Sequence, residues 1–345
     1  THGPRSHRKR VELIMKTFES GFFALENFIA KKEDFNFLQD SESTPWHITY
    51  NVNDPFFTIM GASIVSVLEN NQDHPLVFHL FTDGYSQENR DKVRQLAEKW
   101  HCRCILYELN MAPFEDFHVK VARFSRITYG RIYMPKVLKD MTDRYVYLDA
   151  DTMVIASLAP LFSLDMTGYA MGAVSERPKD AAYRGEYLKL KNGKYFNDGI
   201  MVVNIPEWEK QGITEKAFSF QKEPRERFLG QSQDVLNLTF DGTNLFLPSE
   251  YNEFGGGQDD EGKGVIIHWT GRRKPWQMVL LPFDPQWRTY NALSPWETIT
   301  NTLPIKKPEN YHDFKQWAKY RKKDSFMEYI WGMFWYAWLR LRYKL

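Results

Sequence analysis

From residue 46 onward, short apolar runs alternate with amphipathic stretches along the chain. Runs rich in β-branched and aromatic residues predict strands, and apolar residues that recur every three to four positions predict helices. The predicted strands are 46–52, 75–82, 102–109, 146–148, 169–174, 200–205 and 265–268, and the predicted helices are 57–68, 87–100, 127–138, 207–223 and 233–240. This alternation predicts an α/β fold, with a parallel sheet covered by helices on both faces.

The regions before and after this alternation differ from it. Near the start, apolar residues at helical spacing predict an amphipathic helix. These residues are Ile14, Phe18, Phe22, Leu25 and Ile29. Residues 181–194 are charged and contain glycine, which favours a mobile flap. After residue 283, prolines interrupt a segment without sheet periodicity, and a helix is expected from there to the last residue.

These differences predict three regions. They are an amino-terminal basic segment with its helix (1–45), a sheet domain (46–283) and a carboxyl-terminal helical region (284–345). A chain of 345 residues can bury a sizeable core, either as one large domain with an appendage or as two domains.

Charge and cysteine content narrow the classes of protein. Lys and Arg total 45 against 44 Asp and Glu, a balance that argues against a nucleic-acid partner. Cys102 and Cys104 lie on one predicted strand, face the same side, and are poorly placed for a disulfide. No secretory signal is visible, and no uninterrupted apolar run is long enough to span a bilayer. We therefore expect a cytoplasmic protein.

Two carboxylates follow the central strand. Asp149, Ala150 and Asp151 come directly after residues 146–148, at the edge where open α/β sheets bind their ligands. Carboxylate oxygens there suggest a divalent cation that holds phosphate oxygens. The same triplet also fits a solvated turn after a strand.

Further polar residues follow other strands. His268 ends the last predicted strand and Lys274 comes six residues later. Two carboxylates and one imidazole suit Mn²⁺, and Lys274 with Arg131 would neutralise phosphates. Taken alone, His268 also fits an ordinary histidine at a strand end, and Lys274 a solvated lysine.

Two more pairs of residues have side chains suited to sugars. Asn197 and Asp198 precede a glycine and a buried strand, where they would accept hydrogen bonds from hydroxyls or simply form a turn. Gln233 and Asp234 lie at a predicted helix start. Asp234 fits a catalytic role and a helix-start anion equally well.

Six blocks in order resemble glycosyltransferase family 8, more narrowly the bacterial lipopolysaccharide core α-glucosyl- and α-galactosyltransferases. They are ITYNVNDPFF, SRITYGRIYMPKVL, YVYLDADTMV, YFNDGIMVVN, QSQDVLN and HWTGRRKPW. With SPWE and YHDFKQWAKYRKK further on, the similarity spans about residues 46–323. It implies a GT-A fold, that is, a Rossmann-like, mostly parallel mixed sheet flanked by helices, here with a helical carboxyl-terminal extension. It also implies Mn²⁺ or Mg²⁺, a UDP-sugar donor and retention of the α-anomeric configuration.

The resemblance assigns roles to residues of this chain. The implied metal ligands are Asp149, Asp151 and His268. The implied donor-binding residues are Asn51, Asn53, Arg131, Asp149, Ala150, Asp151, Glu176, Asp198, Gly271 and Lys274. The implied reaction-centre residues are Asn197, Gln233 and Asp234. Relatives commonly have aspartate where this chain has Asn53 and Glu176, so the choice between UDP-glucose and UDP-galactose stays open.

The function expected from the resemblance is transfer of glucose or galactose from a UDP-sugar to the lipopolysaccharide core. Retention could come from attack on the same face as the leaving group or from a double displacement, and we favour the first. One alternative is a non-catalytic sugar- or nucleotide-binding protein on the same fold. Another is a metal-dependent nucleotidyltransferase, which would release pyrophosphate instead of UDP.

The carboxyl-terminal tail suggests a location. Trp331, Trp335 and Trp338 share one helical face, and basic residues flank the helix on both sides. Such a helix is too short to span a bilayer but can lie on an anionic membrane surface, here the inner face of the bacterial inner membrane. The alternatives are a helix packed on the protein itself or an interface between copies in a homo-oligomer.

Overall fold

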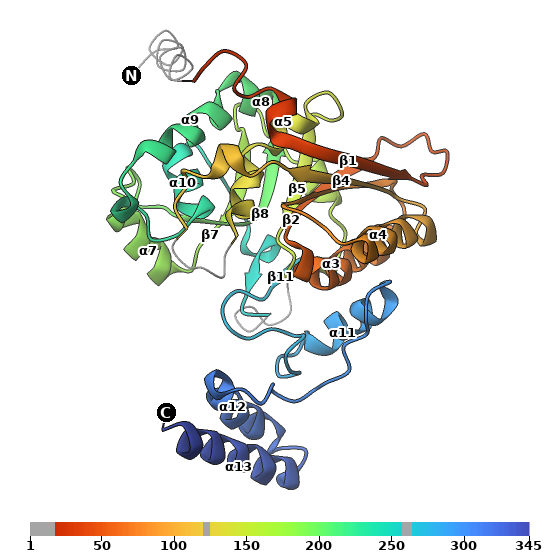
Figure 1. Ribbon diagram of the computed structural model, residues 1–345, viewed down its shortest axis with the longest axis vertical. Coiled ribbons are helices and arrows are strands. Elements are labelled where there is room, and N and C mark those ends of the chain that lie inside the picture. Colours follow the sequence, from red (N-terminus) through yellow and green to blue (C-terminus); the bar gives the residue numbers. More distant parts are fainter. Residues whose placement is uncertain (1–17, 120–124, 257–263, 345) are drawn as a thin grey trace.

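The computed structural model describes residues 18–119, 125–256 and 264–344, and a mixed eight-stranded sheet runs through its centre (Figure 1). The strand order is β1-β4-β3-β2-β5-β8-β7-β9. The strands are β1 (Ile29–Asn36), β2 (Trp46–Val52), β3 (Leu76–Thr82), β4 (Arg103–Leu109), β5 (Arg144–Leu148), β7 (Met171–Ser175), β8 (Phe196–Asn204) and β9 (Leu245–Leu247). β4, β3, β2 and β5 are parallel, whereas β1 and β8 pair antiparallel with their neighbours. The predicted α/β class with a mixed sheet is confirmed.

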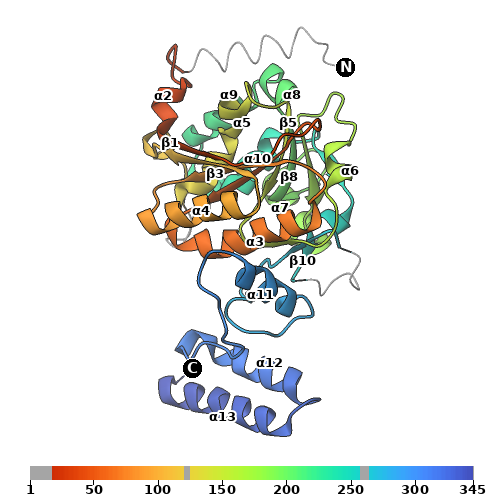
Figure 2. The same cartoon turned by 90° about the vertical axis from the view of Figure 1, so that its right-hand side faces the viewer.

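Helices cover both faces of this sheet (Figures 1 and 2). Val146 and Leu148 of β5 belong to a core shared with α3 (Phe57–Asn70), α4 (Gln87–Lys99) and α11 (Asp284–Leu293). Tyr145 and Tyr147 point to the other core, shared with α5 (Met134–Leu138), α8 (Ile205–Lys210), α9 (Ile213–Ser219) and α10 (Ser232–Thr239). Because both faces are buried, the central strands are mostly apolar, and this is why they were predictable.

A second, three-stranded sheet places the histidine of the candidate site. β6 (Thr152–Val154) pairs antiparallel with β11 (Ile266–His268), which pairs parallel with β10 (Glu253–Phe254). In this register His268 lies opposite Thr152. Asp151 and His268, which are 117 positions apart in the chain, are thereby brought side by side.

The amino-terminal helix prediction is wrong within the described residues. Residues 1–17, with Ile14, lie outside the described residues. Among the described residues that follow, up to Phe28, only α2 (Leu25–Phe28) is helical, and Ile29 already begins β1 at the sheet edge. The apolar spacing instead reflects an aromatic cluster in which Phe22 and Phe28 contact Phe218. β1 has few apolar residues because an edge strand is paired on one side only, so its sequence resembles a surface segment.

The predicted flap at 181–194 is also corrected. Much of it is helical, in α7 (Pro178–Tyr187), and Leu188 and Leu190 pack with Tyr195 in a small buried cluster. Two predicted helices are interrupted. Residues 207–223 divide into α8 and α9 at Gly212, whose φ is 61°, and residues 127–138 begin with a 3₁₀ segment, Arg126–Ile132.

The carboxyl-terminal region contains three helices rather than one. The helix α11 was not predicted, because prolines interrupt the sequence around it. It packs on α3, and Gly61 of α3 leaves room for the ring of Trp296. α12 (Tyr311–Arg321) and α13 (Phe326–Tyr343) then form a hairpin beyond α11 (Figure 1). Ser325 accepts a hydrogen bond from the Glu328 amide and begins α13. The boundaries at residues 45 and 283 stay a prediction.

The two faces of α13 differ. Trp331 packs on Trp317 of α12, and Trp335 lies near Phe314, so these two tryptophans are turned toward the hairpin interior. A neighbouring stripe is exposed, and its residues are Phe326, Met327, Ile330, Phe334, Trp338 and Leu341. Among the described residues, no helix combines the length and the apolarity needed to cross a membrane.

A row of buried polar side chains crosses the parallel strands. The Nδ1 atom of His47 lies 2.8 Å from Nε2 of His79, whose Nδ1 atom lies 3.2 Å from the hydroxyl oxygen of Tyr107. Burial lowers the pKa of His47 to about 4 and that of His79 well below its ordinary value. Both rings are therefore neutral in the folded protein at neutral pH. Nearby, Cys102 and Cys104 are free thiols, as predicted.

We predict that acid destabilises the protein through these rings. The unfolded chain binds protons on histidine near pH 6.5 and the folded chain does not. The free energy of unfolding therefore decreases as the pH is lowered through this range. With the His47 pKa at about 4, this group alone lowers the free energy of unfolding by about 2 kcal/mol between about pH 7.5 and about pH 5. Urea unfolding at both pH values tests this. In His47→Gln the difference between the free energies of unfolding at the two pH values should shrink by that amount. A difference equal to that of the wild type would contradict the prediction.

Candidate metal and sugar-nucleotide site

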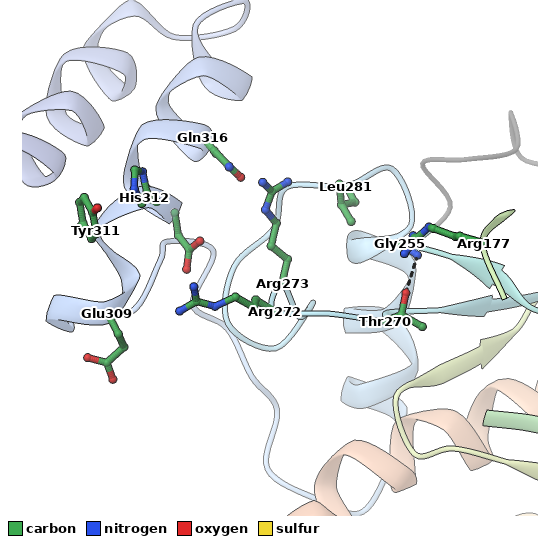
Figure 3. A pocket seen from close by; sticks show the side chains of 11 residues that line it. Arg177, Gly255, Thr270, Arg272, Arg273, Leu281, Glu309, Tyr311, His312 and Gln316 are labelled. Carbon is green, nitrogen blue, oxygen red and sulfur yellow. Dashed lines mark hydrogen bonds between the residues drawn. The ribbon is translucent and has the colours of Figure 1, made fainter. Parts of the chain in front are cut away.

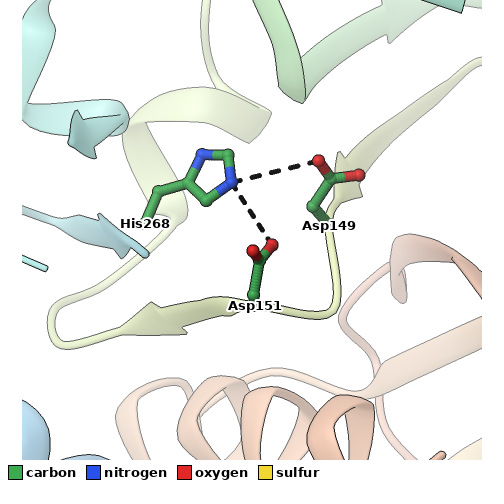
Figure 4. A group of neighbouring side chains, drawn as sticks. All are labelled: Asp149, Asp151 and His268. Atoms are coloured by element: carbon green, nitrogen blue, oxygen red, sulfur yellow. Dashed lines mark ion pairs between the residues drawn. The ribbon is translucent and has the colours of Figure 1, made fainter. Parts of the chain in front are cut away.

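Three candidate metal ligands converge at the carboxyl end of β5 (Figure 4). Nε2 of His268 lies 3.9 Å from Oδ2 of Asp149 and 3.3 Å from Oδ1 of Asp151. One ligand atom from each residue lies within 4.8 Å of the others. Asp149 follows β5, Asp151 precedes β6, and His268 ends β11, so the two sheets together form this cluster.

A hydrogen bond prepares His268 for a metal. Its Nδ1 atom lies 2.9 Å from Oδ1 of Asn252, an oxygen that can only accept, so Nδ1 carries the proton. Nε2 faces the two carboxylates, and a metal ion that took the place of a proton there would bind its lone pair. Two carboxylates and an imidazole nitrogen form a donor set that fits Mn²⁺ or Mg²⁺.

Lys274 lies against the same cluster. Its Nζ atom is 2.6 Å from Oδ2 of Asp151 and also donates to the backbone oxygen of Trp269. Burial would raise the pKa of Asp151, but Lys274 and His268 outweigh it and hold that pKa well below its usual range. Asp151 is therefore ionised at neutral pH, with a cation beside it.

Arg131 is buried beside the cluster. It is 4% exposed, and its terminal nitrogens lie 3.1 Å from Oδ1 of Asp149 and 2.7 Å from Oδ2 of Asp198. Tyr147 also donates to Asp149, at 2.6 Å. Burial raises the pKa of Asp198 even though Arg131 opposes the shift. Arg131 thus binds the carboxylates of two adjacent strands at the same time.

The predicted sugar-binding residues lie beside the metal ligands. Nδ2 of Asn197 donates to Oε2 of Glu176 at 3.1 Å and to Oε1 of Gln233 at 3.4 Å. On its other side, Oδ1 of Asn197 accepts a hydrogen bond from Asn252 at 2.9 Å. Three segments that are separate in sequence are therefore joined at one amide.

Asp234 is fully buried, and its carboxylate is already engaged. Oδ2 accepts hydrogen bonds from the amides of Leu229 and Gly230, at 2.6 and 2.5 Å. Oδ1 accepts from the hydroxyl of Tyr195 at 2.5 Å and from Arg184 at 3.3 Å. These bonds hold the start of α10 and orient Gln233 toward the site.

The remaining predicted residues lie around the cluster. Asn51 ends β2, donates to the backbone oxygen of Ile127, and has a buried Oδ1 atom that accepts no hydrogen bond from the described residues. Asn53 is half-buried just beyond it, and Ala150 is buried between the two aspartates. Gly271 is exposed, and its φ of 91° suits a glycine in the turn that follows β11.

Some residues of the site were missed in the sequence. Asn252 lies in a short irregular segment without a recognisable motif, and only the fold brings it to His268. Ser232 donates a hydrogen bond from its hydroxyl to Asp198 at 2.9 Å. It lies in the QSQDVLN block, in which only Gln233 and Asp234 were predicted to be functional. Tyr147 could have been found, because residues two apart on a strand share a face with each other and it precedes Asp149 by two.

Comparison with known proteins places these residues in a family context. The model of glycosyl transferase family 8 matches residues 47–279. The chain is 26% identical over 296 residues to lipopolysaccharide 1,3-galactosyltransferase of Salmonella typhimurium, covering 81% of this chain and 88% of that protein. It is 28% identical over 293 residues to lipopolysaccharide 1,2-glucosyltransferase of Escherichia coli K12, covering 80% and 86%. A crystal structure of the galactosyltransferase LgtC with donor and acceptor sugar analogs matches with a TM-score of 0.64 at 21% identity, covering 73% of this chain and 97% of that one, and this likeness concerns the fold.

We predict that Asn252→Ala weakens Mn²⁺ binding by about 10- to 100-fold, because His268 loses the acceptor that fixes its tautomer and orientation. Titration calorimetry with MnCl₂ measures this affinity. Asn301→Ala, at an exposed amide, serves as the matched control and should leave it unchanged. Equal affinity in the Asn252 variant and the control would show that the hydrogen bond does not support the site.

Proposed function

This chain belongs to glycosyltransferase family 8, and we propose that it transfers glucose or galactose from a UDP-sugar to a lipopolysaccharide core oligosaccharide, with a divalent metal and with retention of configuration. The observation that carries the proposal is the cluster of Asp149, Asp151 and His268 with Lys274 at its side. The family membership supports hexosyl transfer. The names of the relatives, which act on lipopolysaccharide, support the acceptor class.

In this proposal the chain binds the donor through its diphosphate and its sugar. Asp149, Asp151 and His268 would hold Mn²⁺ or Mg²⁺, which when bound neutralises charge on the diphosphate as a Lewis acid. Lys274, already fixed by Asp151, brings a second positive charge to the oxygen of the leaving UDP. Charges positioned in advance where negative charge develops commonly supply a large part of the rate enhancement.

The remaining donor contacts follow the strand ends. Asn51 and Asn53 would bind the uridine, and their place at the carboxyl end of β2 supports this role. Glu176, Asn197 and Asp198 would bind hydroxyls of the transferred sugar. Arg131 would act indirectly, by holding Asp149 and Asp198 in place.

For the retaining step we propose attack on the face from which UDP departs. The engaged carboxylate of Asp234 supports this choice over a double displacement, since a nucleophile would first have to give up its four hydrogen bonds. Gln233 is a neutral amide and a weak nucleophile. Both residues then shape the site around the anomeric carbon, and a phosphate oxygen of the leaving group accepts the proton of the acceptor hydroxyl.

We also propose that the protein binds to the inner membrane surface through α13. The exposed stripe includes Met327 (74%), Phe334 (58%) and Leu341 (79%), and exposed basic residues lie at the end of the helix. An apolar face with flanking lysines and arginines suits the headgroup region of an anionic bilayer. This location would bring the enzyme to a lipid-anchored acceptor.

One prediction from this proposal concerns the donor. Incubation with MnCl₂ and a panel of nucleotide sugars, without acceptor, should release UDP slowly from one UDP-hexose, and Asp149→Ala with Asp151→Ala should reduce release by at least about 1,000-fold because both oxygen ligands are lost. Coupled detection of UDP measures the rate. Asp40→Ala with Asp73→Ala removes the same charge from the surface as a control. Release of pyrophosphate would indicate a nucleotidyltransferase, and UDP binding without release, even with acceptor present, would indicate a binding protein.

The second prediction concerns the membrane. Replacing Met327, Ile330 and Phe334 by serine should weaken binding to anionic phospholipid vesicles by roughly 100-fold, because three apolar side chains no longer enter the lipid. Co-sedimentation measures the binding. Leu293→Ser, at an exposed leucine outside the hairpin, is the matched control. If the triple variant binds vesicles as well as the control does, α13 does not attach the protein to membranes.

A further inference from the structure

A cavity of about 740 Å³ lies between the loop after β11 and the first turns of α12 (Figure 3). Arg272 and Arg273 enter it from the loop, and Arg177 lies at its far side. Glu309, Tyr311 and Asp313 line it from the hairpin. The cavity thus joins the catalytic sheet region to the carboxyl-terminal helices, and its size suits a ligand of several rings.

The loop that lines the cavity is the loop that carries the candidate donor site. His268 and Lys274 bound this loop and contact Asp151, whereas Arg272 and Arg273 between them line the cavity. Adjacent residues in extended chain are separated by less than about 4 Å per step, so the cavity lies within a few residues' reach of the metal ligands. A molecule held in the cavity would therefore be close to the donor.

The lining has the chemistry of a carbohydrate site. Tyr311 lines the cavity with an aromatic ring that also contacts the rings of His312 and Tyr336, and Glu309 and Gln316 offer planar groups for hydroxyls. These side chains come from α12 and the short turn before it, outside the region matched by the family model. This side of the cavity therefore lies outside the family match, whereas Arg272 and Arg273 on the opposite side lie within it.

Two of the arginines that line the cavity, Arg272 and Arg273, are available to bind an anion. Three arginines face two carboxylates, and no ion pair within 4 Å joins Arg272 or Arg273 to any residue that the structure describes. Burial raises the pKa of Asp313, and the positive charges of Arg273 and Arg272 oppose this shift without a direct ion pair.

We infer that this cavity binds the acceptor, and that it selects an oligosaccharide bearing an anionic group, a phosphate or a sugar carboxylate, held by Arg272 and Arg273. Guanidinium groups bind both anions through paired hydrogen bonds, and two adjacent arginines suit a doubly charged phosphate especially well. The inference rests on the proposed transferase function and adds the charge of its acceptor. Tyr311 would stack on the sugar ring next to the anionic group.

Direct binding tests this without requiring turnover. The probe is a core oligosaccharide released from a truncated lipopolysaccharide, used intact, with its phosphates removed, and with its carboxylates reduced. Titration calorimetry measures its affinity for the full chain saturated with UDP and MnCl₂. We expect one of the two modifications to weaken binding at least tenfold and so to identify the anion. In Arg272→Ala with Arg273→Ala this difference should vanish, and Arg272→Lys with Arg273→Lys should retain part of it.

Several outcomes would overturn the inference. They are equal affinity for all three probes, no binding of any probe, and a double alanine variant that still discriminates between them. Arg94→Ala, at an exposed arginine of α4, controls for a general loss of positive charge and should discriminate as the wild type does. UDP release from the donor, measured separately without acceptor, reports whether the transferase assignment itself holds, so the two failures are distinguishable.

Discussion

The buried guanidinium of Arg131 is the interaction on which the candidate site depends. It binds Asp149 at the end of β5 and Asp198 at the start of β8, two neighbouring antiparallel strands. Two carboxylates this close would repel each other in a buried setting, and the cation between them offsets that repulsion. Removing one partner of a buried charge group commonly costs about 3–5 kcal/mol. Arg131 thus fixes the edge of the sheet from which Asp151 and, through the second sheet, His268 are positioned.

The parts of the fold that could be predicted are those buried on both sides. β2 begins and ends where its apolar run predicts, and α4 begins where Ser86 caps it. The failures lie where tertiary contacts decide. β1 has the sequence of a surface segment because only one of its edges is paired, and α7 is charged because one face is exposed while the other packs over a small separate cluster. Ordered motif blocks supplied the family, which composition and periodicity could not have supplied.

The candidate site divides in the same way. Asp149, Asp151, His268 and Lys274 could be named because each follows a strand or a turn with a recognisable motif, and the structure brings them together. Their supporting residues could not. Asn252 acts through one hydrogen bond made in an irregular segment, and the sequence carries no periodicity or spacing that points to it. The burial of Arg131 beside the carboxylates likewise depends on a 3₁₀ turn where an α-helix was predicted.

One continuous chain of hydrogen bonds runs from His268 through Asn252 and Asn197 to Glu176. A positive charge that arrives at Nε2 of the imidazole polarises each amide in turn and makes the last N–H a stronger donor. By thermodynamic reciprocity, if an ion bound at the imidazole raised the affinity for a ligand at the carboxylate, that ligand would raise the affinity for the ion by the same factor. Such coupling would need only these hydrogen-bonded side chains and no movement of the backbone between them.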